Sequence, residues 1–148
     1  MLAVDTNILV YAHRRETEEH STAMTLLREL AEGSNAWAIA WPCLYEFFSV
    51  VTNPRIWKDA ATTPTQAVAQ VDVWLASPSL RLLEETSEFW PILRRLLLRP
   101  KVRGPIAHDA RVAALCIAHG VEALLSRDRD FALFSELKVR DPFAKRAH

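Results

Sequence analysis

The chain has 148 residues, half of them hydrophobic and 24% charged, which is the composition of an ordinary globular domain and excludes a disordered or fibrous protein. Its 18 basic residues balance its 18 acidic ones, so the molecule as a whole carries no charge to attract nucleic acid. Any binding of nucleic acid must therefore depend on a local patch. At this length one compact core is the simplest arrangement, and we expect a single domain over residues 1–148.

The cysteines and the apolar segments indicate a cytoplasmic protein without membrane association. Cys43 and Cys116 belong to no CxxC or metal-binding pattern, and we expect two buried thiols in a reducing compartment. The chain begins without the basic and apolar regions of a secretory signal. The longest apolar stretch, residues 36–51, is interrupted by polar residues and a proline and is too short to cross a bilayer.

The first half of the chain predicts alternating strands and helices from short apolar runs, helical periodicity and capping residues. In chain order these are a strand at 2–4, a helix capped by Thr6 or Asn7, an amphipathic helix at 20–32 that stops at Gly33, a strand at 36–41 and a helix from Pro42 to Val51. The polar segment 55–63 predicts irregular structure.

The second half predicts the same alternation. In chain order these elements are a helix at 65–75, a strand at 80–83, a helix at 87–98, a basic loop at 99–105, a helix from His108 to His119 and a strand at 122–125. Such alternation favours a mainly parallel sheet covered on both faces. We therefore expect an α/β fold, a three-layer α/β/α sandwich with four to five strands.

Four acidic residues are expected at one edge of this sheet, where the carboxyl ends of parallel strands form the usual ligand site. Asp5 and Asp128 follow predicted strands, and Glu46 and Asp109 lie early in the helices at the same edge. Clustered carboxylates repel one another unless a cation neutralises them. Mg²⁺ prefers oxygen ligands, with Mn²⁺ as the alternative, and either ion can activate water to cut a phosphodiester bond.

Each acid also has a structural interpretation. Asp5 could cap the following helix, Asp109 could interact with a helix dipole, and Asp128 could begin a turn. Glu46 is harder to explain in this way, because its helix is apolar and offers no Lys or Arg three or four residues away. The joint placement of all four acids is a stronger signal than any one of them.

Four motifs together resemble those of PIN-domain ribonucleases. They are Asp5-Thr-Asn, Glu46-Phe-Phe, His-Asp109-Ala-Arg-Val and Ser-Arg-Asp128-Arg-Asp, spread between residue 2 and about residue 139. In size and lack of extra domains the chain is similar to VapC toxins of toxin–antitoxin pairs. The resemblance implies a Mg²⁺-dependent endoribonuclease whose metal site is formed by Asp5, Glu46, Asp109 and Asp128.

The same resemblance implies supporting residues and partners. Thr6 and Ser126 stand where the family has hydroxyl residues that orient the acids, although the family more often has threonine at the second position. Asn7 supports the first helical turn, and Asp130 competes with Asp128 as the fourth acid. VapC relatives are typically homodimers inhibited by a VapB antitoxin, and the apolar residues 43–51 offer a surface for either partner.

A basic run and five tryptophans leave two questions open. Arg94, Arg95, Arg99, Lys101 and Arg103 form either a solvated surface or a contact with RNA phosphates. Of these residues, Arg99, Lys101 and Arg103 are the candidates for RNA binding. The tryptophans Trp37, Trp41, Trp57, Trp74 and Trp90 are interpreted mainly as core or interface, with base stacking as the alternative.

Other functional classes fit less well. A nucleotide-binding domain would need a GxGxxG or P-loop motif, which the three glycines do not form. A phosphotransferase with Asp5 as nucleophile would need a second acid at the position of Asn7. A non-catalytic PIN-like interaction module would have an incomplete acidic cluster. A housekeeping RNA-processing nuclease without antitoxin remains an alternative within the same fold.

Overall fold

A computed structural model of the chain describes residues 1–145, so the last three residues of the predicted domain lie outside it. Five strands form one sheet in the order β3-β2-β1-β4-β5, and every neighbouring pair is parallel. The strands are β1 (Leu2–Val4), β2 (Trp37–Ala40), β3 (Leu80–Leu83), β4 (Ala123–Leu125) and β5 (Val139–Arg140). The predicted α/β class and parallel sheet are confirmed.

Seven α-helices and two 3-10 helices connect these strands within the described residues. The α-helices are α1 (Thr6–His13), α2 (His20–Glu32), α3 (Trp41–Val51), α4 (Pro54–Trp57), α5 (Pro64–Leu75), α6 (Phe89–Leu97) and α7 (Ile106–Ala118). The 3-10 helices are η1 (Lys58–Ala60) and η2 (Arg129–Leu133). Every strand and longer helix that the sequence predicts is present, with ends within two residues of the prediction.

Two local predictions are wrong, and two short elements were not predicted. The segment 55–63 is not wholly irregular, because it contains most of α4 and all of η1. Asp5, and not Thr6 or Asn7, occupies the N-cap position of the first helix. The alternative interpretation of Asp5 as a cap is therefore right for its position, although its side chain makes no capping hydrogen bond. The sequence patterns do not predict η2 or β5. Both elements are too short to show a periodicity, and β5 has only two residues.

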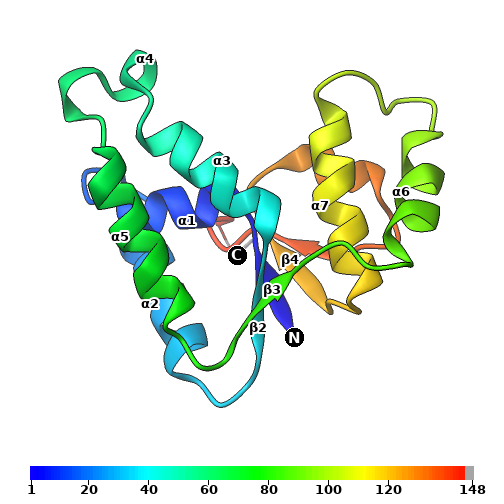
Figure 1. Cartoon of the computed structure of the whole chain (residues 1–148), viewed down its shortest axis with the longest axis horizontal. Coiled ribbons are helices and arrows are strands. Elements are labelled where there is room, and N and C mark those ends of the chain that lie inside the picture. Colours follow the sequence, from blue (N-terminus) through cyan, green and yellow to red (C-terminus); the bar gives the residue numbers. More distant parts are fainter. Residues whose placement is uncertain (146–148) are drawn as a thin grey trace.

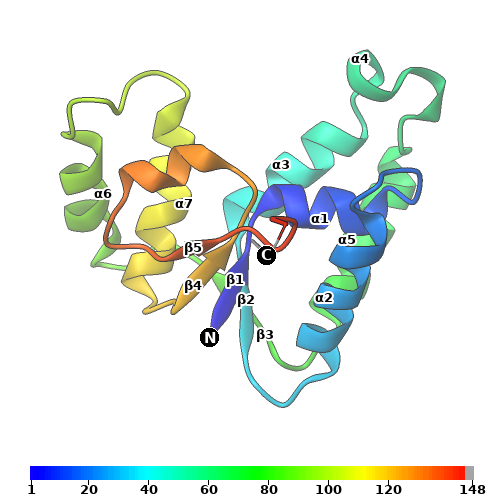
Figure 2. The ribbon, with the colours of Figure 1, turned by 180° about the vertical axis from the view of Figure 1, so that it is seen from behind.

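The helices cover the sheet from two sides. Helices α1, α2 and α5 lie on one side and α6 and α7 on the other, as the two opposite views show (Figures 1 and 2). The largest fully buried side chains come from the strands and from both helical layers, and include Trp37, Phe47, Leu96 and Leu124. No helix among residues 1–145 is long and apolar enough to cross a membrane.

The central strand places the candidate site. β1 lies between β2 and β4, and the strand order changes direction there, which is where ligands bind in open parallel sheets. Asp5 directly follows β1, α3 directly follows β2, and Ser126 directly follows β4. A backbone bond of 3.0 Å from Asp5 N to Leu125 O ties two of these ends together. Residues far apart in the sequence thus meet at one edge.

Candidate active site

Asp5 is the buried centre of the site, with 6% of its surface exposed. Its Oδ2 accepts hydrogen bonds from the Ser126 hydroxyl at 2.7 Å and the Asn7 amide at 3.4 Å, and its Oδ1 lies 3.6 Å from the Cys43 thiol. Burial raises the pKa of Asp5, the charge of Glu46 adds to this, and the bond from Ser126 opposes it. A buried carboxylate in this setting is stabilised by any cation that reaches it.

Glu46 approaches Asp5 from α3. The Thr6 hydroxyl donates a hydrogen bond to Glu46 Oε2 at 3.0 Å, which joins the first turn of α1 to the middle of α3. The apolar residues of α3 do not bury Glu46, because Cys43, Leu44 and Phe47 face the core and the glutamate side is exposed. The glutamate therefore turns toward the site and away from the core.

Three further carboxylates gather beside these two. One oxygen each of Asp109, Asp128 and Asp130 lie within 4.8 Å of one another. The pKa of Asp109 is raised to about 7, first by burial and then by the negative charges of Asp128, Asp5, Asp130 and Glu46. All four predicted acids and the competing Asp130 thus lie within electrostatic reach of one another.

Ser126 and Asn7 hold the loop that carries Asp128. The Ser126 hydroxyl accepts bonds from the Asp128 amide at 3.0 Å and the Asn7 side chain at 3.2 Å while it donates to Asp5. Asn7 Oδ1 accepts from the Arg127 amide at 3.3 Å. A hydroxyl has one proton and two lone pairs, so Ser126 uses its full hydrogen-bonding capacity here.

Two adjoining cavities open over the acids. The smaller has a volume of about 300 Å³ and is lined by Asp5, Thr6, Asn7, Val10, Tyr11, Glu46, Val50, Trp57, Asp109, Val112 and Asp128. The larger, of about 560 Å³, shares Glu46, Asp109 and Asp128 with it. We call the smaller one the acidic cavity. Every one of the four predicted acids lines it, and Asp130 lines neither.

The donor set of the acidic cavity fits a hard divalent cation. Its charged groups are all carboxylates, and none of the ion pairs found within residues 1–145 involves the four acids. Cys43 is no competing soft ligand, because burial raises its pKa well above the ordinary value and keeps the thiol protonated. Oxygen ligands without histidine or thiolate suit Mg²⁺ or Mn²⁺ better than Zn²⁺.

The basic run divides into occupied and free side chains. Arg99 donates a 2.7 Å bond to the Leu133 carbonyl and pairs with Glu136, so it ties the loop before α7 to η2 and the segment after it. Lys101 and Arg103 are exposed on the same loop. All three residues look alike in the sequence, since residue type alone does not distinguish an anchored arginine from a solvated one.

The tryptophans differ in burial and location. Trp37 and Trp74 belong to the core, as expected for most of the five, and Trp90 is 58% exposed on α6. Trp57 lines the acidic cavity together with Tyr11. No local sequence pattern singles out Trp57, because its place depends on the short helix α4 that such patterns do not reveal.

A family model described as the PIN domain matches residues 2–137, which is most of the chain and includes every acid of the site. The chain belongs to the PIN-domain family. It is 34% identical over 140 residues to Ribonuclease VapC48 of Mycobacterium tuberculosis, covering 95% of this chain and 96% of that protein. Within the family the chain is thus a VapC-type ribonuclease, the toxin class of type II toxin–antitoxin systems.

Solved structures share the fold of this VapC-type chain. The crystal structure of VapC20 of Mycobacterium tuberculosis, a sarcin–ricin loop cleaving toxin, matches with a TM-score of 0.65 at 21% identity, covering 89% of this chain and 93% of that one. VapBC2 of Rickettsia felis, bound to a promoter DNA fragment, matches with a TM-score of 0.65 at 20% identity, covering 94% and 96%. At these identities the likeness establishes the fold.

Proposed function

We propose that this VapC-type chain hydrolyses RNA phosphodiester bonds in the acidic cavity, with Asp5, Glu46, Asp109 and Asp128 as ligands of Mg²⁺ and Mn²⁺ as an alternative ion. The observation that carries the proposal is that all four carboxylates line one cavity and that none of them belongs to an ion pair within residues 1–145. When bound, the metal would polarise a phosphoryl oxygen and lower the pKa of a bound water. No nucleophilic side chain is then required.

The side chains around the acids supply orientation. Ser126 holds Asp5 and the Asp128 loop through one hydroxyl, and Thr6 holds Glu46. Asn7 fixes the loop to the start of α1. Pre-oriented ligands of this kind raise metal affinity, because they lose little conformational freedom on binding. We assign Asp130 a secondary role, since its carboxylate lies near Asp109 and Asp128 but does not line the acidic cavity.

Lys101 and Arg103 bind the phosphates of the RNA backbone. Both are exposed on the loop that leads into α7, the helix that carries Asp109. Arg99, the third candidate, contributes less because it is already bonded to Leu133 and Glu136. Phosphate contacts of this kind position single-stranded RNA without reading its sequence.

We further propose that the chain acts in the cytoplasm as a homodimer that a VapB-like antitoxin inhibits. The proposal is supported by the fold shared with a chain of the VapBC2 structure from Rickettsia felis. It is also supported by Tyr45 and Phe48, which expose 62% and 37% of their surface on α3. Exposed aromatic side chains of this size are typical of protein interfaces. Cys43 and Cys116 are both free thiols, which suits a reducing compartment.

The decisive experiment is Mg²⁺-dependent cleavage of total cellular RNA by purified, antitoxin-free protein. We expect discrete cuts that disappear in Asp5→Asn and on addition of EDTA. Asp72→Asn is the matched control, because Asp72 is an exposed acid of α5 outside both cavities. Cleavage that survives in Asp5→Asn or in EDTA would exclude the metal mechanism. A folded protein that cuts no RNA with any divalent ion would instead be a binding module.

A further inference from the structure

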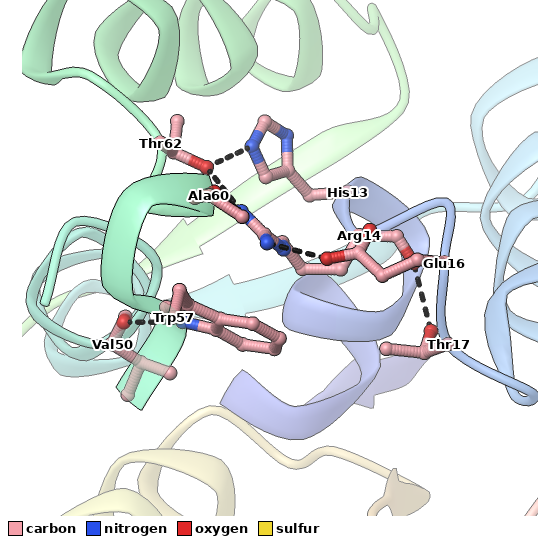
Figure 3. A network of polar contacts seen from close by, with 8 residues as sticks. All are labelled: His13, Arg14, Glu16, Thr17, Val50, Trp57, Ala60 and Thr62. Carbon is pink, nitrogen blue, oxygen red and sulfur yellow. Dashed lines mark hydrogen bonds and ion pairs between the residues drawn. The ribbon is translucent and has the colours of Figure 1, made fainter. Parts of the chain in front are cut away.

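The end of α1 carries a buried arginine that the acidic site does not use. Arg14 exposes 6% of its surface. Its Nη1 donates to the Ala60 carbonyl at 2.7 Å and to the Thr62 hydroxyl at 3.1 Å, and its Nη2 pairs with Glu16 (Figure 3). These bonds tie the end of α1 to the segment that follows α4. A buried charge needs such partners, since its desolvation is costly.

One position of this guanidinium is nevertheless left without a hydrogen-bond partner. Arg14 Nε is the one buried side-chain nitrogen or oxygen of the described residues that lacks one. The guanidinium carbon lies 4.0 Å from the centre of the Trp57 ring, which is a cation–π contact (Figure 3). The arginine is therefore placed by the indole face as well as by its hydrogen bonds.

The Trp57 ring is also held by a hydrogen bond at its edge. The indole N–H donates a 2.8 Å bond to the Val50 carbonyl near the end of α3. Arg14 on one face and Val50 at the edge hold the ring in one orientation. The ring remains half-buried, and of the five tryptophans it is the one that lines the acidic cavity. A rigid aromatic surface thus stands beside the four carboxylates.

The lining of the acidic cavity indicates how a nucleotide could bind beside an aromatic ring. Its charged lining residues are all acids, and they repel RNA phosphates until a metal neutralises them. Its remaining walls are largely apolar and aromatic, with Val10, Tyr11, Val50 and Trp57 among them. A nucleotide can gain binding energy there through its base, because every base has a face that stacks on an aromatic ring.

We propose that Trp57 is a base-stacking residue that binds an unpaired nucleobase next to the scissile phosphate, with Arg14 as the positioning residue that holds the indole from its other face. This inference rests on the proposed function, since it assigns a subsite to the same cavity. The cavity volume of about 300 Å³ is at the lower end of small-ligand sites. The subsite therefore takes one base and not a duplex.

The test uses the full chain carrying Asp5→Asn, which prevents cleavage during a binding measurement in Mg²⁺. The ligand is a single-stranded RNA of about 12 nucleotides in which the fluorescent base 2-aminopurine replaces every third base. We expect the parent protein to quench this fluorescence on binding. Trp57→Leu should remove the quenching and weaken binding by roughly 5- to 150-fold, the range that follows from losing one base–aromatic stack.

Two matched variants separate stacking from a structural role. Trp57→Phe keeps a stacking face without the bond to Val50, so it should retain part of the quenching even if the fold is less stable. Trp90→Leu removes an exposed indole on α6, outside the acidic cavity, and should bind as the parent does. Melting temperatures of all variants show whether any loss of binding reflects unfolding.

The outcomes distinguish this inference from the nuclease proposal. If the chain with Asp5 intact cleaves RNA, but Trp57→Leu binds and quenches as the parent does, the stacking assignment is overturned and the nuclease stands. If Trp57→Leu binds weakly while quenching at saturation is unchanged, a base does not stack on this ring and the assignment is again overturned. Quenching that depends on Trp57 in a chain that cuts no RNA would support the subsite and contradict the nuclease.

Discussion

The Ser126 hydroxyl donates a 2.7 Å hydrogen bond to Asp5 Oδ2 across 121 positions of sequence. The bond joins the ends of the two neighbouring parallel strands β1 and β4, and the same hydroxyl accepts from the backbone of Asp128. One side chain thus sets the distance between two of the proposed metal ligands. Its loss should affect stability and activity together.

We expect Ser126→Ala to lower the free energy of unfolding by about 1–3 kcal/mol, because it leaves the buried Asp5 carboxylate without its shortest donor. Cleavage should fall as well, since Asp5 and the Asp128 loop lose their common support. Ser126→Thr is the control, because it keeps the hydroxyl. Urea unfolding and RNA cleavage measure the two effects. An alanine variant as stable and active as the parent would mean that the hydroxyl does not orient Asp5.

Metal-free protein should become less stable as the pH rises from about 4 to about 7. The pKa of Asp109 is about 7 in the folded protein, against 3.8 for an ordinary aspartate, because of burial and neighbouring carboxylates. In that interval the folded state holds a proton that the unfolded chain has released, so the free energy of unfolding falls with increasing pH. The pKa of Asp5 is raised also and acts in the same direction.

Mg²⁺ should reverse this trend, because it competes with the proton for the same carboxylates. Melting curves in EDTA and in Mg²⁺ at about pH 5 and about pH 8 measure the effect, and we expect the larger stabilisation by Mg²⁺ at the higher pH. Asp109→Asn should flatten the pH dependence in EDTA. An equal response of parent and Asp109→Asn would show that Asp109 does not titrate in this range.

The outline of the fold and the meeting of the acids could be predicted from sequence, because both depend on local patterns. Short apolar runs locate β1 and β4, and the position just after a parallel strand places Asp5 at the ligand-binding edge. Glu46 could be singled out because its helix is apolar and offers no basic partner three or four residues away, although in the structure the glutamate is exposed and is not buried among those apolar residues. In the structure these acids line one cavity.

The place of Trp57 in the cavity lining and the burial of Arg14 against it could not be predicted in this way. Arg14 stands beside Arg15 and Glu16 in the sequence and resembles a solvated surface residue, but tertiary contacts with Ala60 and Thr62 bury it. Trp57 lies in a four-residue helix, too short to show helical periodicity. Both positions depend on contacts between distant segments, which local patterns do not encode.

Arg99 should behave differently from its basic neighbours. Arg99→Ala should lower the free energy of unfolding by about 1 kcal/mol, because it removes the bond to the Leu133 carbonyl and the partly exposed ion pair with Glu136. Lys101→Ala and Arg103→Ala should leave stability within about 0.5 kcal/mol of the parent. They should instead weaken RNA binding and reduce its salt dependence, as expected when a phosphate contact is lost.

Unfolding curves and RNA binding at several salt concentrations separate these effects. If Arg99→Ala weakens RNA binding and leaves stability unchanged, its contacts with Leu133 and Glu136 are not what the residue contributes. If Lys101→Ala and Arg103→Ala leave the salt dependence unchanged, the RNA backbone does not follow this loop.

Asp128 and Asp130 should contribute unequally to catalysis although both lie near Asp109. Asp128 lines both cavities, and its Oδ1 accepts the 2.9 Å bond from the Asp130 amide that begins η2, whereas Asp130 lines neither cavity. Asparagine at position 128 keeps this bond but removes the charge, so Asp128→Asn should reduce cleavage by about 100-fold or more with little change in melting temperature. Asp130→Asn should reduce cleavage less than about tenfold. Rates of RNA cleavage at saturating Mg²⁺, together with Mn²⁺ affinity, measure the difference, and the reverse order of the two variants would identify Asp130 as the fourth ligand.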